Sequence, residues 1–272
     1  MAVLKNKRSL SKYEYEHTFN AMYEYFRIQL RKIPTRRQEW VSKPITDILR
    51  SVHMSIMELN TGYVPYKDRA QWRYDIILSA INSLMALQKP LYCYWDVVDA
   101  DEKHKKNLCE HVNKEIALLH GMLKTNTFYT ENDESRIKHI MYYKNEDINN
   151  AKFLSVMRNL HKYTHGKAIR AKSEFDAFET RTMIELVDDA WYHCLEANKT
   201  IPENKSEYIT RKNHISKAIS CLHKLNRPLL SLFILMGYSE SIMREWSELL
   251  TQELALLSAL QKSDKKRFGK LE

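Results

Sequence analysis

Apolar residues recur along this chain at steps of three and four positions, which is the spacing of one face of an α-helix. The pattern repeats over residues 76–87 and 108–122, and its clearest run is Ile45, Ile48, Leu49, Val52, Ile56 and Leu59. Only 5 glycines and 6 prolines interrupt the chain, too few for the tight turns of a many-stranded β protein. The pattern therefore predicts an all-α protein.

Helix-ending residues divide each half of the chain into four predicted helices. The first helix is expected at 11–31 in one half and at 148–166 in the other. Pro90 and Pro228 lie within otherwise helical runs, and each is expected to kink its helix because proline lacks the backbone donor. The other predicted helix ends and starts are Pro34 with Thr35 as an N-cap, Asn60–Gly62, Asp99 or Asp101, Asn198–Pro202 and Gly237–Ser239.

The two halves also match in sequence at a constant offset of 138 positions. AINSLMALQKPL at 80–91 aligns with AISCLHKLNRPL at 218–229, and the register holds without a gap across three helices. The offset also pairs Glu115 with Glu253, Arg73 with Arg211 and Lys89 with Arg227. Amphipathic helices with short connections form an up-down-up-down bundle most economically. We therefore expect a four-helix bundle at 1–125, a partly packed linker at 126–147 and a second four-helix bundle at 148–272.

The net charge of the chain indicates what kind of partner it binds. The net charge is +9 and the isoelectric point is near 9.2, with basic residues gathered at both ends of the chain. This balance favours a polyanion such as nucleic acid, although it could serve solubility alone. The apolar runs are too short to span a membrane and the N-terminal residues lack a secretory pattern, so a cytoplasmic protein is expected. The scattered cysteines (Cys93, Cys109, Cys194 and Cys221) are expected to be reduced and buried.

Several stretches resemble a known family. They are YFRIQLRKIPTRRQEWVSKPITDILRSVHMSIMELNTG at 25–62, the basic helix with Arg69, Trp72 and Arg73, and ALQKPLYCYWD at 86–96. The second half resembles the same pattern from about Thr180, in LEANKTIP and YITRKNHISKAISCLHKL. The pattern is similar to that of the four-helix-bundle proteins typified by the accessory variability protein of diversity-generating retroelements.

The resemblance implies a non-enzymatic partner of a reverse transcriptase that binds RNA or DNA through basic outer faces. Members of that family are single bundles that assemble into ring-like oligomers, whereas this chain joins two bundles, so a homo-oligomer is an expectation without a stated size. The second half lacks the Pro-Thr-Arg-Arg sequence, because residues 172–175 read Lys-Ser-Glu-Phe. Any function of Arg36 and Arg37 then belongs to the first half.

Seven basic residues are the candidate nucleic-acid contacts, because guanidinium and ammonium groups suit phosphate oxygens. The alternative for each one is an ordinary solvated helix surface. Trp72 and Tyr74 could stack on bases, but packed or half-buried rings are more common. The seven candidates are Arg36, Arg37, Arg69, Arg73, Lys89, Arg211 and Arg227.

Two further classes of function compete with binding. Arg158 followed by His165 fits the loose motif of HEPN-type ribonucleases, and a purely structural oligomerisation protein of a phage or mobile element is the third reading. His161 and His165 have metal-pair spacing, but no carboxylate completes the HExxH arrangement, so no metal is expected. The adjacent acids Asp188 and Asp189 are interpreted as exposed or helix-terminal charges. No catalytic residue and no cofactor is predicted.

Overall fold

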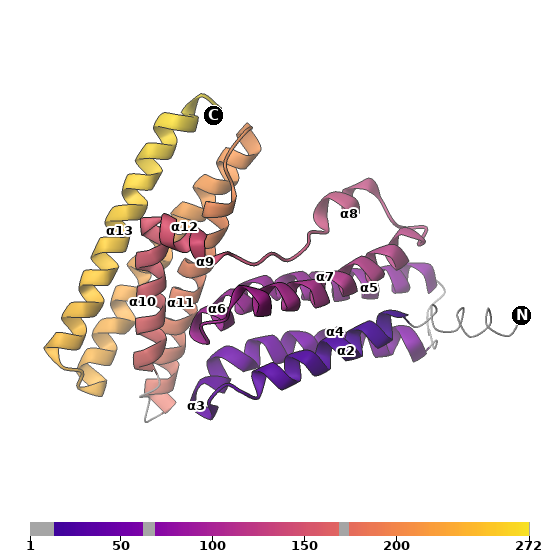
Figure 1. Ribbon diagram of the computed structural model, residues 1–272, viewed down its shortest axis with the longest axis horizontal. Coiled ribbons are helices and arrows are strands. Elements are labelled where there is room, and N and C mark those ends of the chain that lie inside the picture. The colour runs from indigo at the N-terminus through magenta and orange to yellow at the C-terminus, as the bar shows by residue number, and fades with distance from the viewer. Residues whose placement is uncertain (1–13, 62–68, 169–173, 272) are drawn as a thin grey trace, which may run out of the picture. The chain divides into compact units, whose positions relative to one another are not determined.

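The computed structural model describes residues 14–61, 69–168 and 174–271, and every regular element in these ranges is a helix (Figure 1). The all-α class is thereby confirmed. The chain divides into two compact units, Met1–Tyr142 and Tyr143–Glu272. The division falls inside the segment 126–147 that the sequence analysis treated as a linker.

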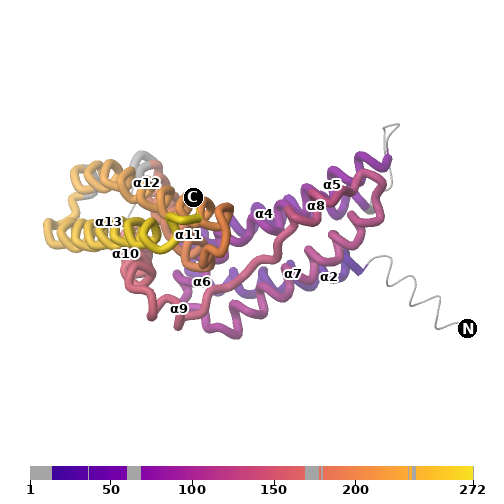
Figure 2. Tube along the Cα trace, turned by 90° about the horizontal axis from the view of Figure 1, so that it is seen from above, coloured from indigo at the N-terminus to yellow at the C-terminus, as the bar shows by residue number. Residues whose placement is uncertain are grey.

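The first unit is built on four long helices that run side by side (Figures 1 and 2). Its core contains large apolar side chains of every long helix, including Phe26, Leu49, Leu84 and Leu119. The long helices are α2 (Glu14–Leu30), α4 (Lys43–Thr61), α5 (Arg69–Ala86) and α7 (Glu102–Lys124). The short ones are α3 (Thr35–Arg37), the π-helix η1 (Gln38–Ser42), α6 (Gln88–Val97) and α8 (Glu131–Arg136).

The second unit also contains four long helices, with α11 packed along α12 and α10 packed against both α11 and α13. Trp191 and Trp246 are completely buried and contribute the largest side chains of its core. The elements are α9 (Asn145–Asn150), α10 (Lys152–Ala168), α11 (Glu174–Lys199), α12 (Lys205–Met236), α13 (Glu240–Phe268) and the 3₁₀ turn η2 (Gly269–Leu271).

Helix ends follow the sequence signals in most places. The carboxylate of Asp101 accepts a hydrogen bond from the backbone N–H of His104 at 2.7 Å and caps α7, as predicted. Gly237 has a φ of +61° just after α12, a conformation that glycine adopts without a steric penalty. The predicted cap at Thr35 is wrong, because Pro34 occupies the N-cap position of α3 and Thr35 is its first helical residue.

The two internal prolines act differently. In the first unit the helix is interrupted, since α5 ends at Ala86 and α6 begins at Gln88, two residues before Pro90. In the second unit Pro228 lies within the continuous helix α12. The helix is therefore interrupted near Pro90, whereas the helix of the second unit continues through Pro228 although proline lacks the backbone donor.

The stretch 126–142 packs against the helices of the first unit. The side-chain amide of Asn113 bonds both the N–H and the carbonyl of Ile140, at 2.8 and 2.9 Å. Gln88 makes the same two bonds to Met141, at 2.7 and 2.6 Å. These paired bonds hold an extended segment on the helices, so this part of the predicted linker belongs to the unit.

Three of the four cysteines are buried as expected, Cys221 is half-buried, and none of the four forms a disulfide. Among the helices that the structure describes, no segment is both long and apolar enough to span a membrane.

Candidate nucleic-acid interface

A groove between α12 and α13 gathers lysines over an apolar floor. Its volume is about 310 Å³. The floor contains Tyr208 and Ile215, which are 3% and 1% exposed, and these two residues lie seven positions apart on one face of α12. The rim carries the exposed side chains of Lys212, Lys262 and Lys265. We call this feature the lysine groove.

The acid in the lysine groove is already neutralised. Asp264 is 3% exposed and is bound by the guanidinium of Arg211, with Nε–Oδ2 and Nη2–Oδ1 distances of 2.5 and 3.4 Å. Arg211 also donates to the carbonyls of Ala197 and Thr200, at 2.5 and 3.0 Å. The buried pair leaves the rim lysines to determine the charge of the groove.

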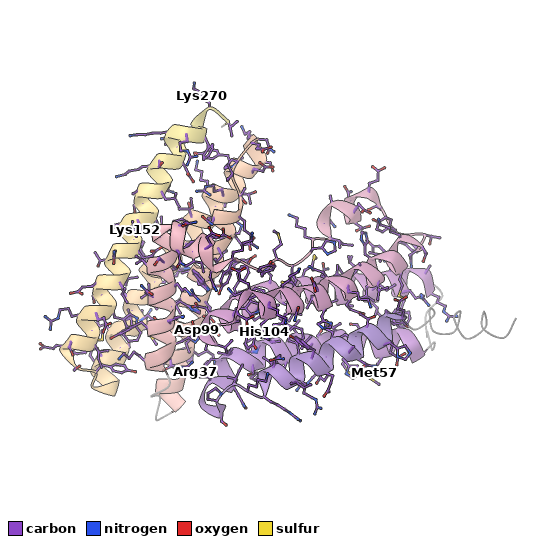
Figure 3. All side chains as sticks on the ribbon, in the orientation of Figure 1. Arg37, Met57, Asp99, His104, Lys152 and Lys270 are labelled. Carbon is purple, nitrogen blue, oxygen red and sulfur yellow. The ribbon has the colours of Figure 1, made fainter. Side chains whose placement is uncertain are left out.

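The positive charge continues to the end of α13. Asp264 is the only acidic residue between Glu253 and Glu272 in the sequence. Lys270 projects at the C-terminal end of this helix (Figure 3), and the guanidinium of Arg267 lies 4.9 Å from the ring of Phe268. Clustered cations raise the local concentration of a polyanion, and phosphate oxygens are natural partners of lysine and arginine.

The predicted contact residues differ in their exposure to solvent. Arg69 and Arg227 are exposed, Arg37, Arg73 and Lys89 are half-buried, and Arg211 is 7% exposed. Arg37 donates to the carbonyl of Val97 at 3.3 Å. The side chain of Arg36 lies outside the described residues. Arg69 and Arg73 share one helix, whereas Arg211 and Arg227 are separated by roughly 24 Å along α12 at 1.5 Å per residue.

The burial of Arg211 distinguishes it from its sequence counterpart in the first unit. The position equivalent to Asp264 is Asn126, whose side-chain amide donates to the carbonyl of Ala70 at 2.8 Å. Arg73 therefore has no carboxylate at the equivalent place and stays half-exposed. The donors of Arg211, in contrast, are used inside the protein.

The lysine groove was missed by the sequence analysis. Lys262, Lys265 and neighbouring cations were recognised as a basic end of the chain, but a charge run does not reveal which helix it faces. Lys212 lies about fifty residues earlier and carries no motif. The near-absence of acids after Glu253 was the signal that could have singled out this end of α13.

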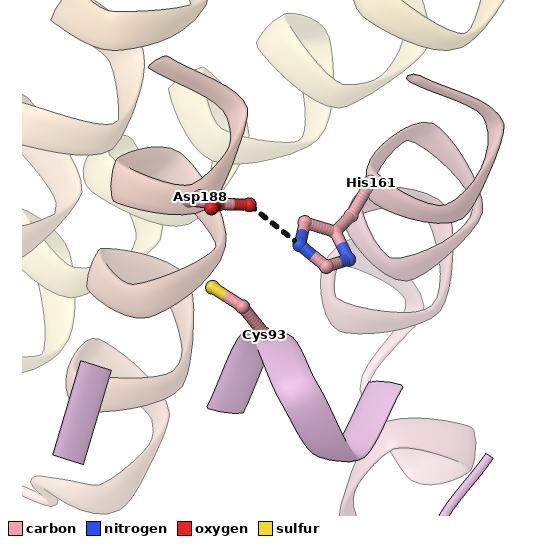
Figure 4. A group of neighbouring side chains, drawn as sticks. All are labelled: Cys93, His161 and Asp188. Atoms are coloured by element: carbon pink, nitrogen blue, oxygen red, sulfur yellow. Dashed lines mark hydrogen bonds and ion pairs between the residues drawn. The ribbon is translucent and has the colours of Figure 1, made fainter. Parts of the chain in front are cut away.

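A second polar cluster is buried between α10 and α11. The Nε2 atoms of His161 and His165 lie 2.9 and 2.7 Å from the same oxygen, Oδ1 of Asp188; Figure 4 shows the bond from His161. Burial would raise the pKa of Asp188, but the two imidazoles outweigh this effect and hold that pKa below its usual range. The interpretation of Asp188 as an exposed charge is wrong, because it is 9% exposed in the middle of α11.

Comparison with known proteins gave no relative: no protein-family model, no curated protein and no solved structure matches this chain. The resemblance to the retroelement accessory family stays a prediction.

Proposed function

We propose that this protein is a non-enzymatic nucleic-acid-binding accessory protein and that the lysine groove is its principal contact surface. The observation that carries the proposal is the gathering of Lys212, Lys262 and Lys265 along a groove whose one carboxylate is neutralised from within. A single strand or a duplex backbone presents regularly spaced phosphates, which such a row of ammonium groups attracts without reading sequence.

The chemistry of the groove favours backbone contacts over base recognition. Tyr208 is 3% exposed, so its ring supports the floor and offers no face for stacking. The exposed cations of the groove and of the helix end are mostly lysines, which bind phosphate as point charges and lack the planar fork that reads guanine. Binding of RNA and of DNA with little sequence preference is therefore expected. Arg69 and Arg73 on α5 are a second contact surface, while Arg211 is left out.

We infer further that the two units are tandem four-helix bundles that derive from one duplicated sequence. Helix boundaries support this inference: α7 and α13 begin at Glu102 and Glu240, which are 138 positions apart, the offset of the sequence match. A role beside a reverse transcriptase and in a homo-oligomer rests on the family resemblance, and an adjacent reverse-transcriptase gene would support it. A cytoplasmic location rests on the short apolar runs and on the N-terminal residues.

A salt titration of binding tests the proposed interface. Affinity for a short RNA and for a duplex DNA should fall steeply with salt, with a slope of log K against log salt of about −0.7 per contact on single strands and −0.9 on duplex DNA. Changing Lys262→Gln and Lys265→Gln together should weaken binding to every sequence and flatten the slope by roughly one to two units.

The matched control removes two exposed lysines of α7, the helix that corresponds in sequence to α13. Lys103→Gln with Lys114→Gln removes the same charge. If the two double variants lose nucleic-acid affinity to the same extent, the lysine groove is rejected as the binding site. A protein that fails to retain nucleic acid even at low salt would instead support the structural oligomerisation alternative.

The ribonuclease alternative has less support. His165 is 6% exposed and its Nε2 atom faces Asp188, so it does not present a ring to an RNA phosphate. RNA recovered from the same titrations should be intact. Cleavage that is lost in both Arg158→Ala and His165→Ala would promote this alternative.

A further inference from the structure

The cluster of two imidazoles and one carboxylate in the second unit has no place in nucleic-acid binding. We propose that His161, His165 and Asp188 bind a divalent first-row transition metal ion, with zinc as the working example. This proposal does not depend on the function of the lysine groove.

Two imidazole nitrogens face one carboxylate oxygen. His161 and His165 are four positions apart, so both rings project from one face of α10, and both direct Nε2 at one oxygen of Asp188 on α11. Zinc binds imidazole nitrogen at about 2.0–2.1 Å and carboxylate oxygen at about 2.0–2.2 Å, so tetrahedral ligands lie roughly 3.3 Å apart. The two nitrogen–oxygen separations, 2.9 and 2.7 Å, are about half an ångström shorter than that spacing.

The proposed metal site is shielded from solvent. His161 is completely buried and its ring stacks on Trp191, with centroids 5.9 Å apart and planes at 29°. The ring centroids of His161 and His165 lie 4.6 Å apart. Imidazole nitrogen together with one carboxylate oxygen is a ligand set for zinc, iron, cobalt or nickel and is poorly suited to calcium or magnesium.

The ion would have a structural consequence. Its ligands come from α10 and α11, so binding would clamp these two helices together in the interior of the second unit. Three protein ligands leave at least one coordination position for water or another ligand. The sequence motif was judged incomplete because the carboxylate is expected next to the histidines in HExxH, whereas here it comes from another helix.

Cobalt and zinc binding by the full chain tests the proposal. Protein stripped with a chelator and titrated with Co²⁺ should develop visible d–d absorption that saturates at one ion per chain. Zinc should displace the cobalt and raise the melting temperature of the stripped protein. Asp188→Asn and His165→Gln should each weaken metal binding by at least roughly 100-fold, because even outer-shell changes cost about 10–100-fold.

The control variant is His214→Gln. His214 and His193 form a second close pair of imidazoles, with Nδ1 atoms 2.9 Å apart. This variant should bind cobalt as the wild type does. The proposal is overturned if the wild type shows no stoichiometric cobalt spectrum and no zinc-dependent stabilisation, or if the His214 variant loses binding as the Asp188 variant does. Because the first outcome is measured on the unmodified chain, a misfolded variant cannot obscure it.

Discussion

Two glutamates are buried in the helices although charged residues normally lie on the protein surface. Glu115 on α7 and Glu253 on α13 are paired by the 138-residue offset, and both are completely buried. Neither oxygen of Glu115 has a hydrogen-bond partner, nor has Oε2 of Glu253, while Oε1 of Glu253 lies 3.9 Å from Sγ of Cys194. Burial raises the pKa of Glu115 to about 8 and that of Glu253 to about 9. Both carboxyls are therefore protonated in the folded protein at neutral pH.

These shifts give stability a definite pH dependence. The unfolded chain releases the two protons near pH 4.5, whereas the folded protein keeps them until about pH 8 and 9. The folded state binds more protons in this window, so the free energy of unfolding should fall as pH rises from 4.5 to 9. Glu115→Gln should reduce this slope in urea unfolding at pH 5 and pH 8, while Glu110→Gln, on the exposed face of the same helix, should not. A stability of the wild type that does not change between pH 5 and pH 8 would contradict the burial of the two carboxyl groups.

At the scale of elements, the equivalent starts of α7 and α13 are capped differently. Asp101 accepts a bond from the N–H of His104, whereas the side chain of Ser239 makes no capping bond to the backbone of α13 and lies 2.9 Å from the hydroxyl of Ser241. Asp101→Ala should therefore lower the free energy of unfolding by about 1 kcal/mol, because an N–H of the first turn and the helix dipole lose their partner.

Ser239→Ala is the matched change on α13 and should cost less, at most a few tenths of a kcal/mol, since no capping bond is lost. Chemical denaturation of both variants gives the comparison. If both variants lose the same free energy of unfolding, the two helix starts are stabilised in the same way, which contradicts the observed bonds.

At the scale of the whole molecule, the chain consists of two compact units, each with a core of apolar side chains. Each core contains side chains of four long helices, enough apolar burial for a domain of this size to fold alone. Fragments 1–142 and 143–272 should therefore each show a helical circular dichroism spectrum and a cooperative thermal transition.

The same fragments locate the binding activity. The 143–272 fragment contains the lysine groove and should retain most of the salt-dependent nucleic-acid affinity, while the 1–142 fragment should bind more weakly through Arg69 and Arg73. A helical 143–272 fragment without affinity would contradict the proposed interface. A fragment without a cooperative transition would show that the units depend on each other for folding.

The sequence by itself determined the all-α class and most helix boundaries, because the spacing of apolar residues and local capping signals such as Asp101 act within a few positions of one another. It also revealed the offset that pairs Glu115 with Glu253. It could not show that both glutamates are buried, because burial depends on which face of a helix meets its neighbours.

Only the tertiary structure decided which polar groups meet. Asp264 lies 53 positions from Arg211 and Asp188 lies 23 from His165, and no local pattern reports contacts over such separations. The packing of α12 against α13 turned one predicted nucleic-acid contact into a buried ion pair, and the packing of α11 against α10 turned an incomplete histidine motif into a candidate metal site. The packing of α12 against α13 placed Lys212 beside the lysines at the end of the chain. Side chains that are distant in sequence can bond or bind a ligand together only when helix packing brings them close. In this protein the packing of the helices decides which of them meet.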